Sequence, residues 1–376
     1  MLEFTARGWR DADLEEVASL TFNALQYSPF FSPERTLDDV QEWLNWIHER
    51  FPPVAVFQAY IGEELVGWLT VTVDVKPGIS ETWRWTPYVS PGAREQEDEI
   101  ATGLIRRCIG YVKERGQTRL EARFDRISEA TMPHYERCKA WFEAEGMHLV
   151  DDSAYMRRSL DPGEFAEHDV ALPPGYRYMP LADADEESLY GCFSRAYDES
   201  GVRSFHDMTY EERRTDFEHY FGGETRDEGA SLVVVGDGEI VGFSLVHSRP
   251  SEAHLGEVGI VPAHRGRGLG RRMVRCSLMR AARDHDTVTL AVDVDNAPAY
   301  ELYRDMGFEV EYRIITHAWR HSRATPPRSS TSCSATSSGA TRTSTTSSMS
   351  RDTSSTNQAS SSSTTPREPT TTDSGL

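Results

Sequence analysis

A turn rich in glycine and arginine, set between an apolar strand and a helix, constrains this chain more than any other feature. Residues 258–270 read Val-Gly-Ile-Val-Pro-Ala-His-Arg-Gly-Arg-Gly-Leu-Gly, and a helix-like stretch follows over 271–284. Pro262 stops the β-branched run, so the pattern predicts a strand, a tight turn and a helix start. The glycines allow backbone N–H groups to converge on one point, and the helix start adds free donors and a positive dipole end. With the nearby arginines, these donors suit the turn to a diphosphate.

Two familiar phosphate-binding loops do not fit this turn. No Lys-Ser or Lys-Thr follows the last glycine, which excludes the P-loop of nucleoside triphosphatases. The glycine spacing is not G-x-G-x-x-G, because Arg271 stands at the third position, and a dinucleotide fold places its turn after the first strand. A solvated loop and a fragment of basic, nucleic-acid-binding sequence remain as alternatives.

A second pattern lies about thirty residues further on. Residues 287–294 alternate like a strand, and the segment 295–308 opens with Asp-Asn and closes with Met-Gly-Phe. Asp295 or Asn296 can cap a helix that has Pro298 in its first turn. Taken alone, this segment is an ordinary amphipathic helix whose tyrosines pack on a sheet.

Together the two patterns resemble the GNAT superfamily of N-acyltransferases. The Arg-x-x-Gly-x-Gly turn is similar to that family's loop for the pyrophosphate of acyl-CoA, and the second segment resembles its Asn-x-x-Ala-x-x-x-Tyr-x-x-x-Gly-Phe motif. The resemblance implies acetyl-CoA as the acyl donor. It also implies a set of cofactor-binding residues: Ile260, Val261, Arg265, Gly266, Arg267, Gly268, Leu269, Gly270, Arg271 and Asn296.

The resemblance further implies how the donor lies. In the family, the pantetheine arm bonds like an extra strand where the sheet splays apart, which corresponds here to the backbone of Ile260 and Val261. The N–H of about Val261 would polarise the thioester carbonyl. The Asn296 side chain would bond the pantetheine arm, and the Tyr303 hydroxyl would protonate the leaving thiolate.

The acceptor amine must be neutral to attack, so a base or a water chain must take its proton. Glu257, His254 and Glu252 are candidates on or near the motif strand. We place Glu257 with Tyr303 as the catalytic pair.

The element order predicts two similar domains of an α/β fold (α+β type), each a mixed, mainly antiparallel sheet flanked by helices. Domain 172–320 is expected to contain the strand 176–181, the helices 185–200 and 209–220, a hairpin over 230–248, the motif strand 254–261 and a last strand 308–319. Domain 1–163 repeats this order with the strand 4–8, the helix 11–25, a hairpin over 54–74, the strand 82–89, the helix 101–115 and the strand 119–124. The arrangement resembles tandem GNAT proteins of the mycothiol synthase type.

The first domain lacks the donor-binding and proton-donating residues of the second. Phe142 stands at the position of Tyr303 and has no proton to donate, and Tyr135 stands at the position of Asn296. The loop after Pro91 carries carboxylates where phosphate would lie: Glu95, Glu97, Asp98 and Glu99. We expect a degenerate half that packs on the active one and shapes the acceptor pocket.

Composition excludes several classes of protein. No apolar run approaches the roughly 20 residues that span a bilayer, and the first residues lack the core of a signal peptide. The net charge of −20 argues against nucleic acid as the main partner. The five cysteines are scattered without metal-ligand spacing. These features predict a cytoplasmic protein without a metal, membrane or nucleic-acid partner.

The basic residues and the C-terminal segment are both unusual. Only three of the 40 basic residues are lysine, namely Lys76, Lys113 and Lys139. This acid-rich, lysine-poor composition resembles that of halophilic archaeal proteins, in which carboxylates keep the surface hydrated in salt; codon bias is the alternative. Residues 321–376 are rich in Ser and Thr and are predicted to be disordered, either as a genuine segment or as a frame-shift product.

The function that best fits is transfer of an acetyl group from acetyl-CoA to a primary amine of a small molecule or peptide by direct attack. A non-catalytic acyl-CoA-binding sensor or interaction module is the alternative, and it would not need Tyr303. An arginine-rich RNA-binding protein is a third hypothesis, disfavoured by the net charge. The sequence assigns neither the acceptor nor the oligomeric state.

Overall fold

The computed structural model describes residues 1–25, 34–50, 55–76, 78–198, 200, 202–223 and 225–321. They belong to one compact unit, Met1–Arg323. The predicted tail 321–376 lies outside the described residues except for His321. Among the helices of the described ranges, none is long and apolar enough to cross a membrane.

The elements follow the predicted order in each half. The first half contains β1 (Leu2–Arg7), α1 (Leu14–Leu25), α2 (Leu37–Arg50), β2 (Ala55–Ile61), β3 (Glu64–Lys76), β4 (Ile79–Thr82), β5 (Tyr88–Val89), α3 (Glu97–Glu114), β6 (Arg119–Ile127), α4 (Met132–Ala144) and β7 (His148–Ser159). The second contains α5 (Glu167–Val170), β8 (Tyr176–Pro180), α6 (Glu186–Asp198), α7 (Arg203–Asp207), α8 (Tyr210–Phe221), β9 (Leu232–Gly236), β10 (Glu239–Ser248), β11 (Ala253–Ile260), α9 (Leu269–Ala281), β12 (Thr287–Asp293), α10 (Ala297–Asp305) and β13 (Glu309–Arg320).

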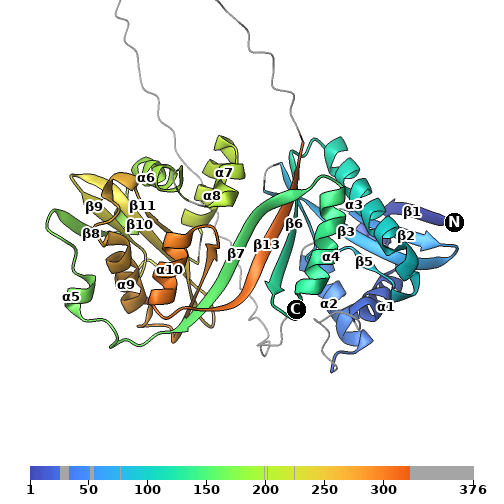
Figure 1. Cartoon of the computed structure of the whole chain (residues 1–376), viewed down its shortest axis with the longest axis horizontal. Helices are drawn as coiled ribbons and strands as arrows, with labels where there is room; N and C mark the ends of the chain where they lie inside the picture. Colours follow the sequence, from blue (N-terminus) through green and yellow to red (C-terminus); the bar gives the residue numbers. More distant parts are fainter. Residues whose placement is uncertain are drawn as a thin grey trace, which may run out of the picture. The chain divides into compact units, whose positions relative to one another are not determined.

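One continuous sheet joins the two halves. Its strand order among the described residues is β1-β2-β3-β4-β6-β13-β7-β12-β11-β10-β9-β8, with β5 paired on β3. Only the pairs β4–β6 and β11–β12 are parallel within this sheet. Figure 1 shows β7 and β13 running between the two sets of elements. The predicted fold class, a mixed and mainly antiparallel sheet flanked by helices, is confirmed.

The halves exchange strands at the centre of this sheet. β13, from the end of the second half, pairs with β6 of the first half on one side and with β7 on the other. β7, whose residues fall within the expected domain 1–163, pairs with β12 as well. Neither half of the sheet is therefore complete without a strand from the other.

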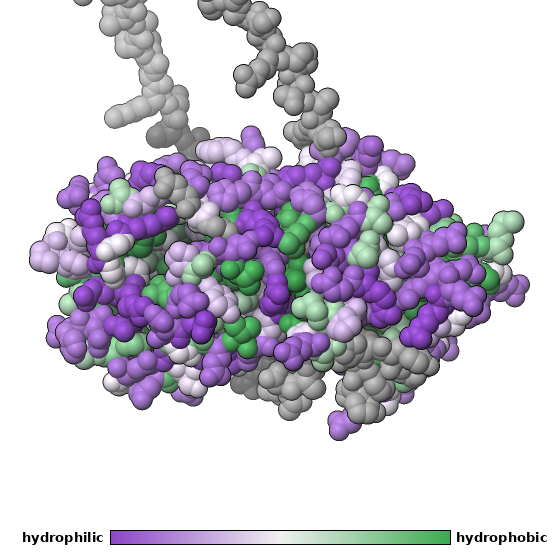
Figure 2. Space-filling view, viewed as in Figure 1, coloured by the Kyte–Doolittle hydropathy of each residue, from purple (hydrophilic) through white to green (hydrophobic). Residues whose placement is uncertain are grey.

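Each half nevertheless has its own apolar core. In the first half, α3 packs on β3, and Leu104 and Phe142 are fully buried. In the second half, α6 and α9 pack on β10, where Phe243 and Met273 are fully buried. Each such side chain contributes about 1.5–3 kcal/mol of hydrophobic free energy. Hydrophilic side chains cover most of the face shown in Figure 2, in keeping with the high content of charged residues.

The predicted strand 82–89 is wrong, because the chain leaves the sheet after Thr82. Trp85 adopts a left-handed backbone conformation with φ of 65°, and its indole N–H donates to the Asp125 carbonyl oxygen at 3.1 Å. Pro87 has no N–H to give to a strand ladder. The chain resumes as β5, which pairs with β3 instead.

Other predictions differ in their bounds. The helices α1, α3 and α9 begin at Leu14, Glu97 and Leu269 rather than at residues 11, 101 and 271. The sequence did not indicate α2, α7 or β7. The omission of β7 matters most, since this strand connects the halves.

We expect a fragment of residues 1–163 not to fold cooperatively, because without β13 the facing edges of β6 and β7 lie unpaired. Circular dichroism during heating should show no sharp transition for this fragment. A chain ending at Arg323, which keeps β13, is the control and should melt as one unit. A cooperative melt of the isolated fragment would contradict the strand exchange.

Candidate active site

Strands β11 and β12 pair over three residues and then separate. Ala253–Leu255 lies parallel to Val288–Leu290. Beyond this point β11 stays paired with β10 as far as Ile260, whereas β12 follows β7 as far as Asp293. The sheet therefore opens between β11 and β12, and a cavity of about 1120 Å³ extends from the opening to strands of the first half.

The backbone along the opening corrects one prediction. The Val261 N–H already donates to the Val241 carbonyl oxygen at 2.9 Å, so it faces β10 and is not available to a thioester. Because N–H groups alternate between the two edges of an antiparallel strand, those of Val258 and Ile260 face the opening. Val261 itself is buried in the core and does not line the cavity.

The glycine turn has the predicted geometry. Gly266 and Gly268 both have φ of 74°, a conformation that L side chains rarely adopt, and Gly268 is the N-cap of α9. The first intrahelical bond runs from the Arg272 N–H to the Gly268 oxygen at 3.3 Å. The N–H groups of residues 269–271 therefore have no acceptor within the helix, and they add to the positive dipole end beside the cavity.

The arginines of the turn mainly brace it. Arg265 donates to the carbonyl oxygens of Ile260 at 3.0 Å and of Ala196, at the end of α6, at 2.7 Å. Arg267 contacts the Tyr176 hydroxyl and the Ala263 oxygen and does not line the cavity. Arg271 pairs with Asp305 at 2.8 Å. The sequence predicted the positive charge but not that these side chains hold the loop in place.

The two polar residues of the second motif, Asn296 and Tyr303, line the same cavity, as does its Ala299. Asn296 occupies the N-cap position of α10, but its side chain does not cap the helix. The Tyr303 ring is buried against Phe308, and its hydroxyl makes no hydrogen bond with any described residue. Burial, and then the nearby Glu257 carboxylate, raise the pKa of Tyr303. The phenol is therefore protonated at neutral pH and can donate.

Glu257 is a carboxyl group tuned toward neutral pH. It lies on β11, lines the cavity and accepts a hydrogen bond from the Tyr197 hydroxyl. Burial, reinforced by Asp216, raises the pKa of Glu257 to about 7, although the Tyr197 bond and Lys76 oppose this. Such a group is ionised often enough at pH 7 to accept a proton and basic enough to keep it.

The other two candidate bases are less suited. Glu252 is buried, pairs with Arg157 at 2.8 Å and accepts the Tyr155 hydroxyl at 3.2 Å. Burial, with the help of Arg249, lowers the pKa of His254 to about 3, so its ring is a weak base. The geometry favours Glu257 among the three.

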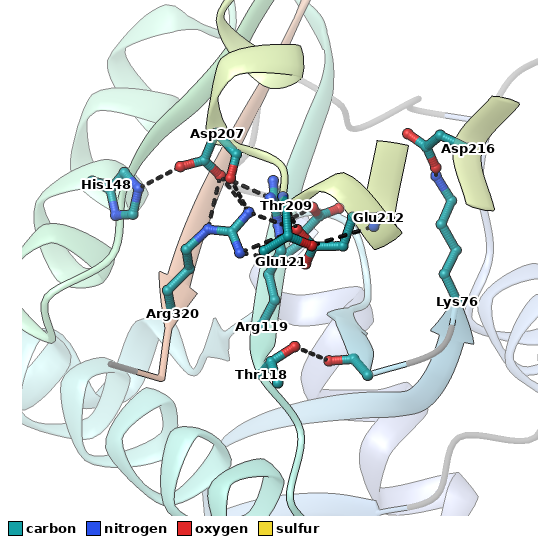
Figure 3. A network of polar contacts seen from close by, with 11 residues as sticks. Lys76, Thr118, Arg119, Glu121, His148, Asp207, Thr209, Glu212, Asp216 and Arg320 are labelled. Carbon is teal, nitrogen blue, oxygen red and sulfur yellow. Dashed lines mark hydrogen bonds and ion pairs between the residues drawn. The ribbon is translucent and has the colours of Figure 1, made fainter. Parts of the chain in front are cut away.

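The first half supplies part of the cavity wall, through residues that the sequence did not single out. Lys76 at the end of β3 pairs with Asp216 of α8. The buried Arg119 of β6 pairs with Glu121 at 2.5 Å and with Asp207 of α7 at 2.7 Å. Figure 3 shows how these groups connect α7 and α8 to strands of the first half. The alternating charged residues at 119, 121 and 123 indicate a strand with one polar face. The sequence does not indicate what this face lies against, because that depends on the strand exchange.

The equivalent place in the first half is filled. Phe142 is fully buried, and the Tyr135 hydroxyl bonds the His317 ring at 3.0 Å. Asp98, in the first turn of α3, accepts the Trp141 indole N–H at 2.7 Å. The cavity beside this helix has a volume of about 50 Å³.

Comparison with known proteins agrees with this geometry. The profile described as the Acetyltransferase (GNAT) family matches residues 188–308. A mycothiol acetyltransferase of Saccharomonospora viridis is 31% identical over 214 residues, which cover 51% of this chain and 68% of that protein. This chain belongs to the GNAT acetyltransferase family. A mycothiol acetyltransferase of Kocuria rhizophila is 27% identical over 264 residues, covering 66% of this chain and 78% of the relative.

The GNAT enzyme described here transfers an acetyl group from acetyl-CoA to an amine. Its fold is similar to the crystal structure of a GCN5-related N-acetyltransferase from Sphaerobacter thermophilus, with a TM-score of 0.53, 19% identity, and coverage of 84% of this chain and 95% of that one. The expected enzyme class, an N-acetyltransferase, is confirmed. The relatives named here do not support a halophilic archaeal source.

We expect Gly268→Asp to abolish acetyl-CoA binding, because the substitution forces a side chain into a left-handed conformation and places a carboxylate beside the phosphates. Titration calorimetry with acetyl-CoA measures the loss. Gly238→Ala, at φ of +85° in the β9–β10 turn with nothing within 4 Å of the added Cβ, controls for backbone strain alone. Unchanged affinity in the folded Gly268 variant would show that the turn does not hold the donor.

Proposed function

We propose that residues 172–320 hold acetyl-CoA and carry the catalytic pair, and that residues 1–163 form a GNAT-like half without a donor site. One observation carries this proposal. The glycine turn, Tyr303 and Glu257 border a single cavity at the point where β11 and β12 separate. In the first half, a buried phenylalanine and an indole-bonded carboxylate stand in the corresponding places.

The donor contacts follow from the N–H groups around the opening. We assign the diphosphate to the turn and the start of α9, and the pantetheine arm to the backbone of Val258 and Ile260 rather than of Val261. The Asn296 side chain is assigned to the same arm. The residues assigned to the diphosphate are Gly266, Gly268, Leu269, Gly270 and, through their charge, Arg265, Arg267 and Arg271.

The reaction needs one base and one acid. Glu257 takes a proton from the acceptor, and the neutral amine attacks the thioester carbonyl carbon. The backbone N–H of Val258 or Ile260 stabilises the negative charge that develops on the carbonyl oxygen. Tyr303 gives its proton to the sulfur as the C–S bond breaks, and the extra proton on the attacking nitrogen then returns to the Tyr303 oxygen. The products are an amide and the free thiol of CoA, and Glu257 is left protonated.

The acceptor is a small polar amine bound in the part of the cavity that the first half completes. Lys76, Asp151, Ser153 and Tyr155 line that part. Such a wall offers ionic and hydroxyl partners to a hydrophilic molecule. The similarity to mycothiol acetyltransferases supports testing mycothiol precursors among the first acceptors. We place the enzyme in the cytoplasm, where acetyl-CoA occurs and the described cysteines stay free.

A panel of amines incubated with acetyl-CoA tests the proposal, with release of free thiol and the acetylated amine as readouts. The proposal predicts amine-dependent thiol release by the full chain. Tight binding of acetyl-CoA without turnover on any amine would instead favour the acyl-CoA sensor.

We expect Tyr303→Phe to lower kcat by about 10²–10⁴-fold, the usual contribution of a positioned general acid, while the affinity for acetyl-CoA changes little. The substitution keeps the ring that packs on Phe308. Tyr300→Phe on the same helix removes a hydroxyl outside the cavity and should leave kcat unchanged. Wild-type turnover in the Tyr303 variant would mean that the thiolate leaves without this proton.

The rate should rise with pH through about 7, because Glu257 can accept a proton only after it has lost its own. Tyr303, with its raised pKa, imposes no fall in this range. Glu257→Gln should remove the rise and lower kcat by about 10²-fold or more. Both profiles are measured with the same amine, so that the titration of the amine cancels. An unchanged inflection in the variant would exclude Glu257 as the base.

A further inference from the structure

Three strands at the junction of the halves form a polar floor in the cavity. Arg123 on β6 lies in register with Thr316 on β13, which lies in register with Asp151 on β7. All three residues line the cavity that also contains Glu257. A cation, a hydroxyl and a carboxylate therefore lie side by side, where a molecule bound in the cavity can contact them.

Arg123 differs from the other lysine and arginine side chains that line this cavity. Lys76 and Arg119 are paired with carboxylates, as Figure 3 shows, and the remaining arginines have ion pairs or hydrogen bonds. The Nε of Arg123 is buried without a hydrogen-bond partner, and no described residue forms an ion pair with its guanidinium. Asp151 and Glu81 influence Arg123 electrostatically but do not reach ion-pair distance.

A buried donor without an acceptor destabilises a folded protein, and the Nε of Arg123 is such a donor. The chain has 60 acidic residues and 40 basic ones, so a shortage of carboxylates does not explain why Arg123 has no ion pair with a described residue. Thr316, the residue beside Arg123 on β13, is uncharged, and Asp151 lies one strand further along the same row. The Arg123 side chain lines the cavity. An anionic group of a bound molecule would satisfy it.

We infer that Arg123 binds a carboxylate of the acceptor, so that the acceptor is an amine that also carries a carboxylate. This inference rests on the proposed function, since it concerns the same cavity. A guanidinium matches the planar carboxylate through two parallel N–H bonds. A phosphate dianion fits less well, because it would be repelled more strongly by the carboxylates around it: Asp151, Asp216, Glu257 and Asp293.

Tyr220 of α8 is close to both of the protein groups that such an acceptor must reach. Its phenol lies within electrostatic range of Glu257 and Asp216 and also of Arg123 and Asp151. The amine must reach Glu257 while the carboxylate reaches Arg123, so the acceptor extends past Tyr220. The first half, through β6, then determines which amines are accepted, although it supplies neither the base nor the acid.

The test measures binding of matched amine pairs to the full chain saturated with CoA. The pairs are β-alanine and its amide, 4-aminobutyrate and its amide, and glycylglycine and its amide, titrated by calorimetry. We expect at least one carboxylate form to bind about tenfold or more tighter than its amide, as for other hydrogen bonds to charged groups. Arg123→Met should abolish this preference. Arg123→Lys should keep only part of it, because lysine has the positive charge but not the two parallel N–H donors of the guanidinium.

Arg106→Met is the matched control, since Arg106 of the first half is 68% exposed and pairs with Glu145 away from the cavity. It should keep the preference, and acetyl-CoA should bind all variants equally. Equal binding of acids and amides by the wild type, or a preference that survives in Arg123→Met, would overturn the inference. Failure of the proposed function would appear differently, as an absence of thiol release with the binding preference intact.

Discussion

The separation of β11 from β12 after three paired residues is the constraint on which the site depends. β11 stays bound to β10 through a register shift near Ser244, while β12 is held by β7, so the strands diverge. Gly259 allows this packing, because a Cβ there would lie 2.5 Å from the Phe243 ring. The divergence leaves backbone N–H groups without a neighbouring strand, brings the glycine turn to the edge of the opening and directs Glu257 into the cavity. An extended molecule can bind in this opening as an additional strand.

Because β13 is exchanged, the degenerate half forms part of the cavity wall. β6, β13 and β7 lie side by side, so polar residues of the first half face the catalytic residues of the second. The ion pairs around Arg119 connect α7 to this floor. Burial alone would raise the pKa of Asp207, but Arg119 and Arg320 lower it. This stabilisation is present above the ordinary carboxyl pKa and is lost as the pH falls through the lowered value. The walls of the cavity therefore stay fixed at neutral pH.

Local features were predictable from the sequence because they depend on few residues. Gly266 and Gly268 at positive φ, the strand end at Pro262, and Tyr303 facing the cavity all follow from short motifs. The Val261 N–H was assigned wrongly, because the edge to which an N–H points depends on strand register. The positions of β7, β13 and Arg123 depend on pairing between residues far apart in the chain. Periodicity along the sequence carries no record of such pairing.

Hydrogen exchange of the full chain with and without acetyl-CoA tests the central claim most directly. If the donor completes the sheet between β11 and β12, acetyl-CoA should slow exchange at the N–H groups of Val258 and Ile260 and at residues 266–271. Exchange over residues 91–99 of the first half should not change. Protection of residues 91–99, or none at Val258 and Ile260 under saturating acetyl-CoA, would contradict the account.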